Sequence, residues 1–496
     1  MQITEVKMSK DSIGIKLLYL NSFIAGLVTL IIEIAGTRIM APFFGTTVFT
    51  WSALIGVTLL SLAVGYYAGG IFAEKNNRQW AVFAASLAAG AVTAIIMLYK
   101  DPVLKLSDLM GAKAGVITAS ILLFSPALFI LGAISPLSVK FASSKLGAGK
   151  SAGMIFAVST AGSFLGAILA GYWLIPHFGI RTVFIICSVL PVLTGLAGIA
   201  VLKTDIKPGI VTLCAVLLAG LTGYAVSGKN YGKNIKVVYE KENHFGRILI
   251  IDSPQNIRIL MVDGTIQMYY DLNKKESGAE YVDLLEKGAD LAGQKNTALV
   301  IGAGAGALTG KLEKRGIHTD NVEIDKDIAF AAKEYFGSTS EFIIEDGRRY
   351  IRRCGKTYDM IFFDVFKGYS ICPYMATKES FQEAKNILNQ GGVLSMNIVA
   401  EAPGPSGIHG NTVNLVYSTM KSVFKDVKIS VMTEGNFANY VFYASDSGIN
   451  YGDTVKLQGK HAVLTDDKNN MENIYSSVIE KWRDSNKKLL GSRFML

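Results

Sequence analysis

Charged residues are scarce in this chain of 496 residues, because 18% of it is charged and 50% is hydrophobic. The mean hydropathy of +0.34 is high for a soluble protein. The net charge of +9 contains no dense basic run, so nucleic-acid binding has little support. Basic loops beside a membrane explain that charge better.

Cysteine is sparse as well. The chain has four, and their spacing shows no paired metal pattern: Cys187, Cys214, Cys354 and Cys372. Neither a disulfide framework nor a metal site is therefore predicted. The first apolar run is too long for a signal peptide and lacks a small-residue cleavage pattern, so we interpret it as a retained span.

Long apolar runs fill the first half of the chain. A membrane-spanning helix needs about 20 mostly apolar residues. Seven stretches meet that requirement: 17–36, 50–73, 80–99, 114–135, 152–175, 180–202 and 208–227. We therefore predict an α-helical membrane domain of about seven spans over residues 1–228. The protein would be a multi-pass component of the cell membrane, with the lipid bilayer as a partner.

Some residues inside these runs are small, rigid or ionisable. Two glycine pairs have the spacing that lets helices approach closely, and we interpret them as packing sites: Gly65 with Gly69, and Gly162 with Gly166. Three prolines are expected to bend or end their helices: Pro126, Pro136 and Pro191. Glu33 and Arg38 are either a structural anchor or a polar site, and a direct pair between them would need a break such as Gly36 could give.

From residue 236 onward, apolar and polar residues alternate. The segments that resemble strands of a small antiparallel unit are 235–240, 247–252 and 257–262. Another strand follows the turn at Asp263-Gly264, and a helix over about 278–292 closes this unit, which we place at 229–292.

The remaining part, residues 293–496, is organised around the stretch 297–325. Residues 298–301 read as a buried strand, and three glycines make a turn that opens a helix over 307–314: Gly302, Gly304 and Gly306. Glycine suits this position because the backbone must turn sharply and let a ligand approach closely. A second strand ends at Glu323, which is placed to accept hydrogen bonds from ribose hydroxyls.

Further strands at 342–345, 358–363 and 393–399 alternate with helices, which predicts a doubly wound parallel sheet. Three acids fall at the carboxyl ends of strands, where such sheets bind ligands: Glu323, Asp346 and Asp364. The alternative is that each of these acids caps the helix that follows it.

Residues 237–496 resemble the spermidine synthase (polyamine aminopropyltransferase) family. The resemblance is carried by VVYEKENHFGRILI, LMVDGTIQ, VIGAGAGAL, VEID, EDGRRYI, YDMIFFDVF and GGVLSMNIV. The membrane half, with its EIAGTRIMAPFFG segment, looks like the integral-membrane branch of that family. The resemblance implies a Rossmann-like methyltransferase/aminopropyltransferase domain preceded by a small β-unit.

The resemblance also implies roles for individual residues. The glycines of the turn would line S-adenosylmethionine or its decarboxylated form, bound as cosubstrate without a metal. Glu323 would hold the ribose, Asp346 would bond the adenine amino group, and Gln267 would reach over the cosubstrate. Gln267 could instead be only a hairpin residue. Asp364 matches the catalytic aspartate that orients and deprotonates an acceptor amine.

Two positions depart from the family pattern, and both belong to the expected substrate-binding part. Soluble members carry a second acid three residues after the catalytic aspartate, where this chain has Lys367. Lys367 would face a carboxylate, on an amino-acid acceptor or on S-adenosylmethionine, or else be a solvated loop residue. A tyrosine-histidine-glutamate run of the family is replaced by Tyr281-Val282-Asp283. Cys372 is interpreted as a packing residue.

The main hypothesis is that the protein is a membrane-integrated, spermidine-synthase-like transferase of polyamine biosynthesis. It would alkylate an amine and release methylthioadenosine. Three alternatives stay open: an intramolecular cyclase or lyase, a methyltransferase, and a transporter with a nucleoside-sensing domain. Basic residues divide almost evenly between the two membrane faces, so charge leaves orientation open. A cytosolic nucleoside favours a cytoplasmic catalytic domain, and a homodimer is possible.

Overall fold

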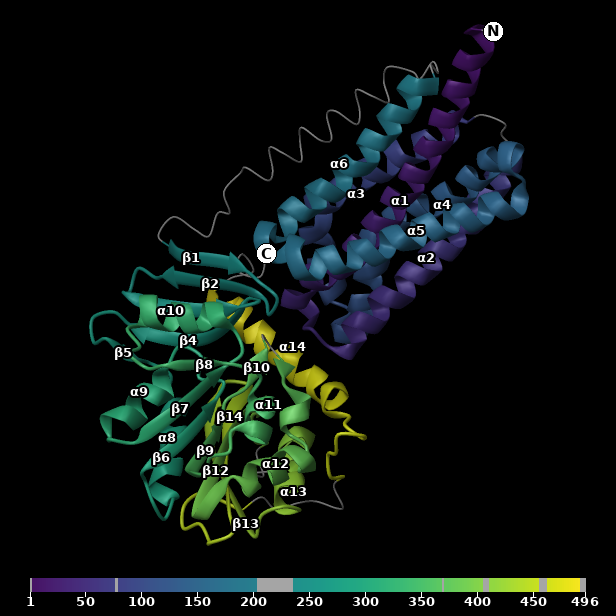
Figure 1. The fold of residues 1–496 in the computed structure, drawn as a ribbon. Coiled ribbons are helices and arrows are strands. Elements are labelled where there is room, and N and C mark those ends of the chain that lie inside the picture. Colours follow the sequence, from purple (N-terminus) through teal and green to yellow (C-terminus); the bar gives the residue numbers. More distant parts are fainter. Residues whose placement is uncertain are drawn as a thin grey trace. The chain divides into compact units, whose positions relative to one another are not determined.

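The computed structural model describes residues 2–75, 79–202, 235–367, 370–404, 410–454 and 462–490. The chain divides into two compact units, Met1–Asn230 with Glu242–His244, and Tyr231–Lys241 with Phe245–Leu496. Each unit is described by itself below (Figure 1). The domain boundaries that the sequence placed at 228 and 292 stay predictions.

The first unit is helical throughout its described part. Its elements are α1 (Gln2–Phe44), α2 (Val48–Lys75), α3 (Trp80–Asp108), α4 (Gly111–Leu146), α5 (Ala148–Leu169), the π-helical turn η1 (Ala170–Leu174) and α6 (Ile175–Leu202). By length and composition, five helices among the described residues are apolar enough to cross a membrane, and the fifth runs over Ala148–Val201.

The count of seven spans is not confirmed. The fifth candidate helix holds the stretches predicted at 152–175 and 180–202, which run together through η1 and the start of α6. The backbone leaves helical geometry only at Gly179, where φ is 71° and ψ is 165°. The stretch predicted at 208–227 lies outside the described residues.

The prolines do not end their helices, which corrects that part of the expectation. Pro126 and Pro136 lie inside α4, and Pro191 lies inside α6. Long apolar helices tolerate proline because their packed neighbours can satisfy the freed backbone groups. Helix α1 also continues through Gly36, so it contains no break that would bring Glu33 directly to Arg38.

The glycine pairs act as packing sites, as predicted. A Cβ on Gly65 would lie 2.3 Å from the carbonyl oxygen of Phe129 in α4, and one on Gly69 would lie 2.8 Å from Ala133 Cα. Gly162 and Gly166 of α5 approach α1 in the same way, with 2.1 Å to Phe23 O and 2.3 Å to Leu27 O. Any side chain at these four positions would force the helices apart.

The second unit begins with an antiparallel meander. Its strands are β1 (Lys236–Glu242), β2 (Arg247–Asp252), β3 (Ile257–Val262), β4 (Thr265–Asp271) and β5 (Glu276–Ser277), paired in that order. The hairpin from β3 to β4 turns at Asp263 and Gly264, whose φ angles of 47° and 77° fit a tight hairpin turn. Helix α8 (Tyr281–Leu291) follows.

A seven-stranded sheet forms the centre of this unit (Figure 1). Its strands are β6 (Thr297–Ile301), β7 (His318–Glu323), β8 (Phe342–Ile344), β9 (Tyr358–Phe363), β12 (Leu388–Glu401), β13 (Asp426–Glu434) and β14 (Phe437–Ser445). The order is β13-β14-β12-β9-β6-β7-β8. Strands β12, β9, β6, β7 and β8 are parallel, as predicted, and β14 is antiparallel to both β12 and β13.

Helices and short hairpins join these strands. The helices are α9 (Ala307–Lys314), α10 (Lys326–Phe336), α11 (Gly347–Arg353), α12 (Lys378–Asn386), α13 (Asn411–Lys421) and α14 (Met471–Leu490). After β9 come a small antiparallel ribbon, β10 (Phe366–Lys367) and β11 (Ser370–Ile371), and the 3-10 turn η2 (Pro373–Met375).

The meander packs against helix α10 in a hydrophobic core. Ile248, Ile250 and Leu260 of the meander pack in one buried cluster with Ile328 and Phe336 of α10. Apolar burial therefore holds the meander on α10. The meander lies beside the carboxyl ends of β6 and β7, from which the chain continues into α9 and α10.

Candidate active site

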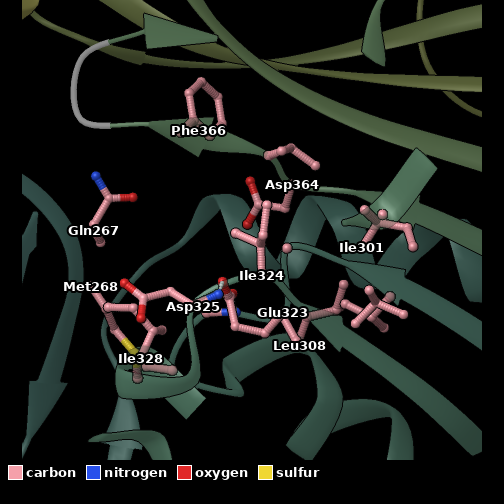
Figure 2. Close-up of a pocket in the computed structure, with 18 of the residues that line it drawn as sticks. Gln267, Met268, Ile301, Leu308, Glu323, Ile324, Asp325, Ile328, Asp364 and Phe366 are labelled. Carbon is pink, nitrogen blue, oxygen red and sulfur yellow. Dashed lines mark hydrogen bonds between the residues drawn. The ribbon is translucent and has the colours of Figure 1, made fainter. Parts of the chain in front are cut away.

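A cavity of about 330 Å³ opens at the carboxyl ends of β6, β7, β8 and β9. Strand β6 pairs with β7 on one side and β9 on the other, so the strand order reverses at β6. This is the switch point at which open α/β sheets bind ligands. Figure 2 shows Gln267 of the meander facing Asp364 and Glu323 of the sheet across the pocket.

The glycine turn forms the floor between β6 and α9. Gly302, Gly304 and Gly306 have positive φ angles of 78°, 52° and 82°. A Cβ on Gly302 would lie 2.3 Å from the carbonyl oxygen of Asp364, so only glycine fits between the ends of β6 and β9. Gly302 and Gly304 line the cavity, whereas Gly306 is the N-cap residue that precedes α9.

Glu323 ends β7 and is 8% exposed. Its Oε2 accepts a hydrogen bond of 2.9 Å from Gly304 N, and its Oε1 accepts one of 3.0 Å from Asp325 N. Burial raises the pKa of this carboxyl to about 7, although the two backbone N–H groups act in the opposite direction. Each oxygen keeps a further lone pair for a ligand hydroxyl. The helix-capping role falls to Asp325, which accepts from Asp327 N at the start of α10.

Asp346 combines the two interpretations that the sequence left open. It caps α11, because Oδ1 accepts from Arg349 N at 2.9 Å, and it also lines the cavity. Its Oδ2 accepts a hydrogen bond of 3.0 Å from the phenol of Tyr374, which lines the cavity from η2. The adenine contact expected for Asp346 stays a prediction.

Asp364 follows β9 and has both carboxylate oxygens held. Tyr281 Oη at the start of α8 donates to Oδ2 at 3.1 Å, and Asn397 Nδ2 in β12 donates to Oδ1 at 2.9 Å. Burial raises the pKa of Asp364 to about 6, and the two hydrogen bonds partly oppose that rise. The phenol of Tyr281 stays protonated, because burial and the charge of Asp364 raise its pKa well above the usual value.

Gln267 lies on β4 and lines the cavity, as its predicted position over the cosubstrate requires. Its buried Nε2 has no hydrogen-bond partner among the described residues. An unpaired buried donor is costly, so a polar ligand atom or water would satisfy it. The backbone of Lys367 lies in β10, but its side chain lies outside the described part of the chain. Cys372 lines the cavity and is not part of a disulfide.

Two residues of the site were missed by the sequence reasoning. Asn397 is 2% exposed and lies in the quoted GGVLSMNIV segment, in a buried strand where a polar residue was the only local signal. Tyr374 comes from a loop with no recognisable pattern. Both reach the site through pairings between distant segments.

The charged side chains described as lining the cavity are all acidic. No Lys or Arg is among the lining residues whose side chains are described. Five carboxylates line the cavity: Glu323, Asp325, Glu345, Asp346 and Asp364. The described residues also contain no group of three or more His, Cys, Asp or Glu that could hold a metal ion. Such a cavity favours a cationic ligand.

Comparison with known proteins gives a family for this unit. The family model described as "Spermine/spermidine synthase domain" matches residues 284–447. The polyamine aminopropyltransferase of Thermoplasma acidophilum is 26% identical over 196 residues, which cover 37% of this chain and 68% of the relative. That of Thermoplasma volcanium is 28% identical over 197 residues, covering 37% and 68%. That of Vibrio vulnificus is 31% identical over 138 residues, covering 26% and 46%.

The matched region contains the glycine turn and the strand ends that carry Glu323, Asp346 and Asp364. The helical unit lies outside it, and its apolar helices are consistent with a membrane branch. The chain therefore carries a spermine/spermidine synthase domain and is, in that domain, a transferase of the polyamine aminopropyltransferase type.

Proposed function

We propose that this protein is a membrane-integrated transferase that moves the carbon chain on the sulfur of decarboxylated S-adenosylmethionine to an amine and releases methylthioadenosine. The observation that carries the proposal is the environment of Asp364. Its carboxylate is half-buried at the switch point, held by Tyr281 and Asn397, and placed within one strand spacing of the glycine turn. Its pKa of about 6 leaves it mostly ionised at neutral pH.

Asp364 would act on the acceptor rather than on the donor. The carboxylate holds the acceptor ammonium and takes its proton, which leaves a neutral amine. The amine nitrogen then attacks the carbon bonded to the sulfonium. A C–N bond forms, the C–S bond breaks, and its electron pair stays on sulfur as the neutral thioether. A sulfonium is already a good leaving group, so positioning and proton removal are the main tasks.

The nucleoside would occupy the β6–β7–β8 side of the cavity. Glu323 keeps acceptor capacity for the ribose hydroxyls beside its two backbone N–H partners. Asp346 lies at the end of β8, fixed by Arg349 N and Tyr374, and offers acceptors to an adenine amino group. The glycine turn lets the backbone approach the ligand without a Cβ in the way.

The charges of the cavity favour the decarboxylated donor over S-adenosylmethionine. The decarboxylated form carries no carboxylate, so it adds no negative charge to a cavity whose described charged lining residues are all acids. S-adenosylmethionine adds a carboxylate, and the described lining side chains include no Lys or Arg to pair with it. An unpaired carboxylate among like charges is unfavourable.

The membrane placement rests on the five apolar helices of the first unit. Large apolar side chains on α2 and α5 are exposed, including Leu59, Leu60 and Phe164, which suits contact with lipid. We place the catalytic unit on the cytoplasmic side, because the nucleoside donor is made there.

The test uses the full chain purified in detergent or lipid nanodiscs. It is incubated with S-adenosylmethionine or the decarboxylated form, with and without an amine, and the products are identified by mass spectrometry. The expected result is amine-dependent release of methylthioadenosine from the decarboxylated donor, lost in Asp364→Asn. Methylthioadenosine formed without an amine would instead indicate a lyase or cyclase, and S-adenosylhomocysteine would indicate methyl transfer.

A further inference from the structure

At the acceptor end, the described lining residues place one carboxylate, that of Asp364, beside the aromatic ring of Phe366. We propose that the acceptor is an amine with one ammonium attached to an apolar or aromatic body, and not a diamine. This inference rests on the proposed function. The inference comes from how the carboxylates and the aromatic side chains are distributed around Asp364 (Figure 2).

Four of the five lining carboxylates belong to the nucleoside side. Glu323 and Asp325 follow β7, and Glu345 and Asp346 follow β8, two and three strands away from β9 in the sheet. With a strand spacing of about 4.8 Å, the nearer pair is about 10 Å from the β9 position. Among the described residues that line the cavity, Asp364 is therefore the one carboxylate at the end of β9.

The four carboxylates on the nucleoside side also have partners already. Glu323 accepts from two backbone N–H groups, and Asp325 caps α10. Glu345 pairs with Arg353 and Arg349, and Asp346 accepts from Arg349 N and Tyr374. A second ammonium would need a partner of its own, because a buried charge without one is strongly unfavourable.

The aromatic wall next to Asp364 is formed by Phe366, and Trp482 and Phe437 pack behind it. Phe366 lines the cavity two residues further along the chain and lies beside Asp364 in Figure 2. Its ring packs edge-on against Trp482 of α14 at a centroid distance of 5.7 Å, and Trp482 contacts Phe437 at 6.3 Å. The pairing of Phe366 with the buried Ile371 holds it in the β10–β11 ribbon.

This wall suits an apolar group better than a second charge. Asp364 can hold one ammonium through the acceptor capacity that Tyr281 and Asn397 leave. The rest of the acceptor would then lie against Phe366, where apolar area is removed from water. The sequence agrees, because position 367, three residues after Asp364, is a lysine and not an acid.

The same chemistry could come from a dissolved monoamine or from the amine headgroup of a membrane lipid. The test therefore has two arms. Full-length protein in phosphatidylcholine nanodiscs is given decarboxylated S-adenosylmethionine with 2-phenylethylamine, n-hexylamine or putrescine. In the second arm, phosphatidylethanolamine replaces part of the lipid and no soluble amine is added. Methylthioadenosine and the alkylated amine are both quantified by mass spectrometry.

We expect kcat/KM for at least one monoamine to exceed kcat/KM for putrescine tenfold or more, because an apolar pocket discriminates on that scale. If the acceptor is the lipid amine, its turnover should exceed the turnover of putrescine by the same factor. An equal or higher value for putrescine overturns the inference and leaves the proposed transferase intact. Absence of amine-dependent methylthioadenosine in every arm overturns both.

Variants at the wall give an independent readout. Phe366→Ala should lower kcat/KM for the monoamine about tenfold while nucleoside affinity, measured by calorimetry, stays unchanged. Phe330→Ala, which removes an exposed phenylalanine of α10 outside the cavity, is the matched control and should change neither value. Phe366→Asp should shift the preference towards putrescine by adding a second acid. An amine preference unchanged in both Phe366 variants, with nucleoside binding retained, contradicts the proposal.

Discussion

The phenol of Tyr281 lies 3.1 Å from Asp364 Oδ2 and donates a hydrogen bond to it. Tyr281 begins α8 and Asp364 follows β9, so the contact joins segments 83 residues apart. Because the bond stabilises the ionised carboxylate, it lowers a pKa that burial alone would place still higher. The pair thus keeps a half-buried base ionised near neutral pH.

Tyr281→Phe should raise the pKa of Asp364 above its present value of about 6. A lost hydrogen bond to a charged group is worth about 1.5 kcal/mol, or about one pKa unit. The acidic limb of kcat/KM should therefore move to higher pH, and activity lost at pH 7 should return by about pH 8.5. Tyr335→Phe, outside the cavity, is the control. A limb that stays in place would show that Tyr281 does not tune the base.

Asp364→Asn should remove the base while keeping the shape of the side chain. Product formation should fall about 10²-fold or more, the usual contribution of a general base. Nucleoside affinity should change little, because Glu323 and Asp346 lie at the ends of other strands. Calorimetry and product analysis on the same preparation separate the two effects. Full turnover in this variant would rule out the proposed mechanism.

Local pattern was enough to predict the glycine turn and the strand ends. Helix α9 and strand β9 have the predicted bounds, because an apolar run, a glycine turn and an amphipathic helix are encoded within a few residues. The three acids at strand ends follow from the same pattern. Their roles toward a ligand stay predictions.

Contacts between segments that are distant in the sequence could not be predicted. Asn397 reaches Asp364 only because β12 pairs with β9, and Tyr374 reaches Asp346 only through the path of the chain after β9. The antiparallel strands β13 and β14 were also missed. In the membrane half, length and hydropathy located the apolar stretches, and the non-helical backbone at Gly179 separates those predicted at 152–175 and 180–202.

Gly302→Ala should disable the pocket without a change in polarity. The new Cβ would meet the backbone of Asp364 at 2.3 Å, at a φ of 78° that alanine rarely adopts. We expect loss of nucleoside binding and a free energy of unfolding lower by more than about 1 kcal/mol. Gly310→Ala, in α9 with open space around its Cβ, is the matched control and should stabilise the helix by up to about 1 kcal/mol. Equal behaviour of the two variants in thermal unfolding and calorimetry would contradict this account.

Gly65→Ala should destabilise the helical unit. Its Cβ would meet the carbonyl oxygen of Phe129 at 2.3 Å, so α2 and α4 would have to separate. Gly70→Ala, five residues further along α2, meets nothing within 4 Å and serves as the control. Thermal stability in detergent, followed for full-length protein, should fall for Gly65→Ala only. Alanine favours the helix at both positions, so a fall of the same size at Gly70 would contradict the packing account.

Glu323→Gln should make stability less dependent on pH. In the unfolded chain this carboxyl ionises above its ordinary value of 4.5, whereas in the folded protein its pKa is about 7. Between these values the folded state holds an extra proton, so the wild type loses stability as pH rises and reaches a plateau above pH 7. The shift corresponds to about 3 kcal/mol, and glutamine, which cannot ionise, should remove that loss.

The measurement is thermal unfolding of ligand-free wild type and Glu323→Gln at pH 5 and pH 8. The decrease in melting temperature between the two pH values should be smaller in the variant, because other titrating groups contribute equally to both proteins. The same variant should bind nucleoside more weakly, because a neutral amide replaces the charged acceptor proposed for the ribose. Identical pH dependence would show that Glu323 already carries its charge in the ligand-free protein. Unchanged nucleoside affinity would contradict its role in holding the ribose, so the two readouts test the burial of Glu323 and its function separately.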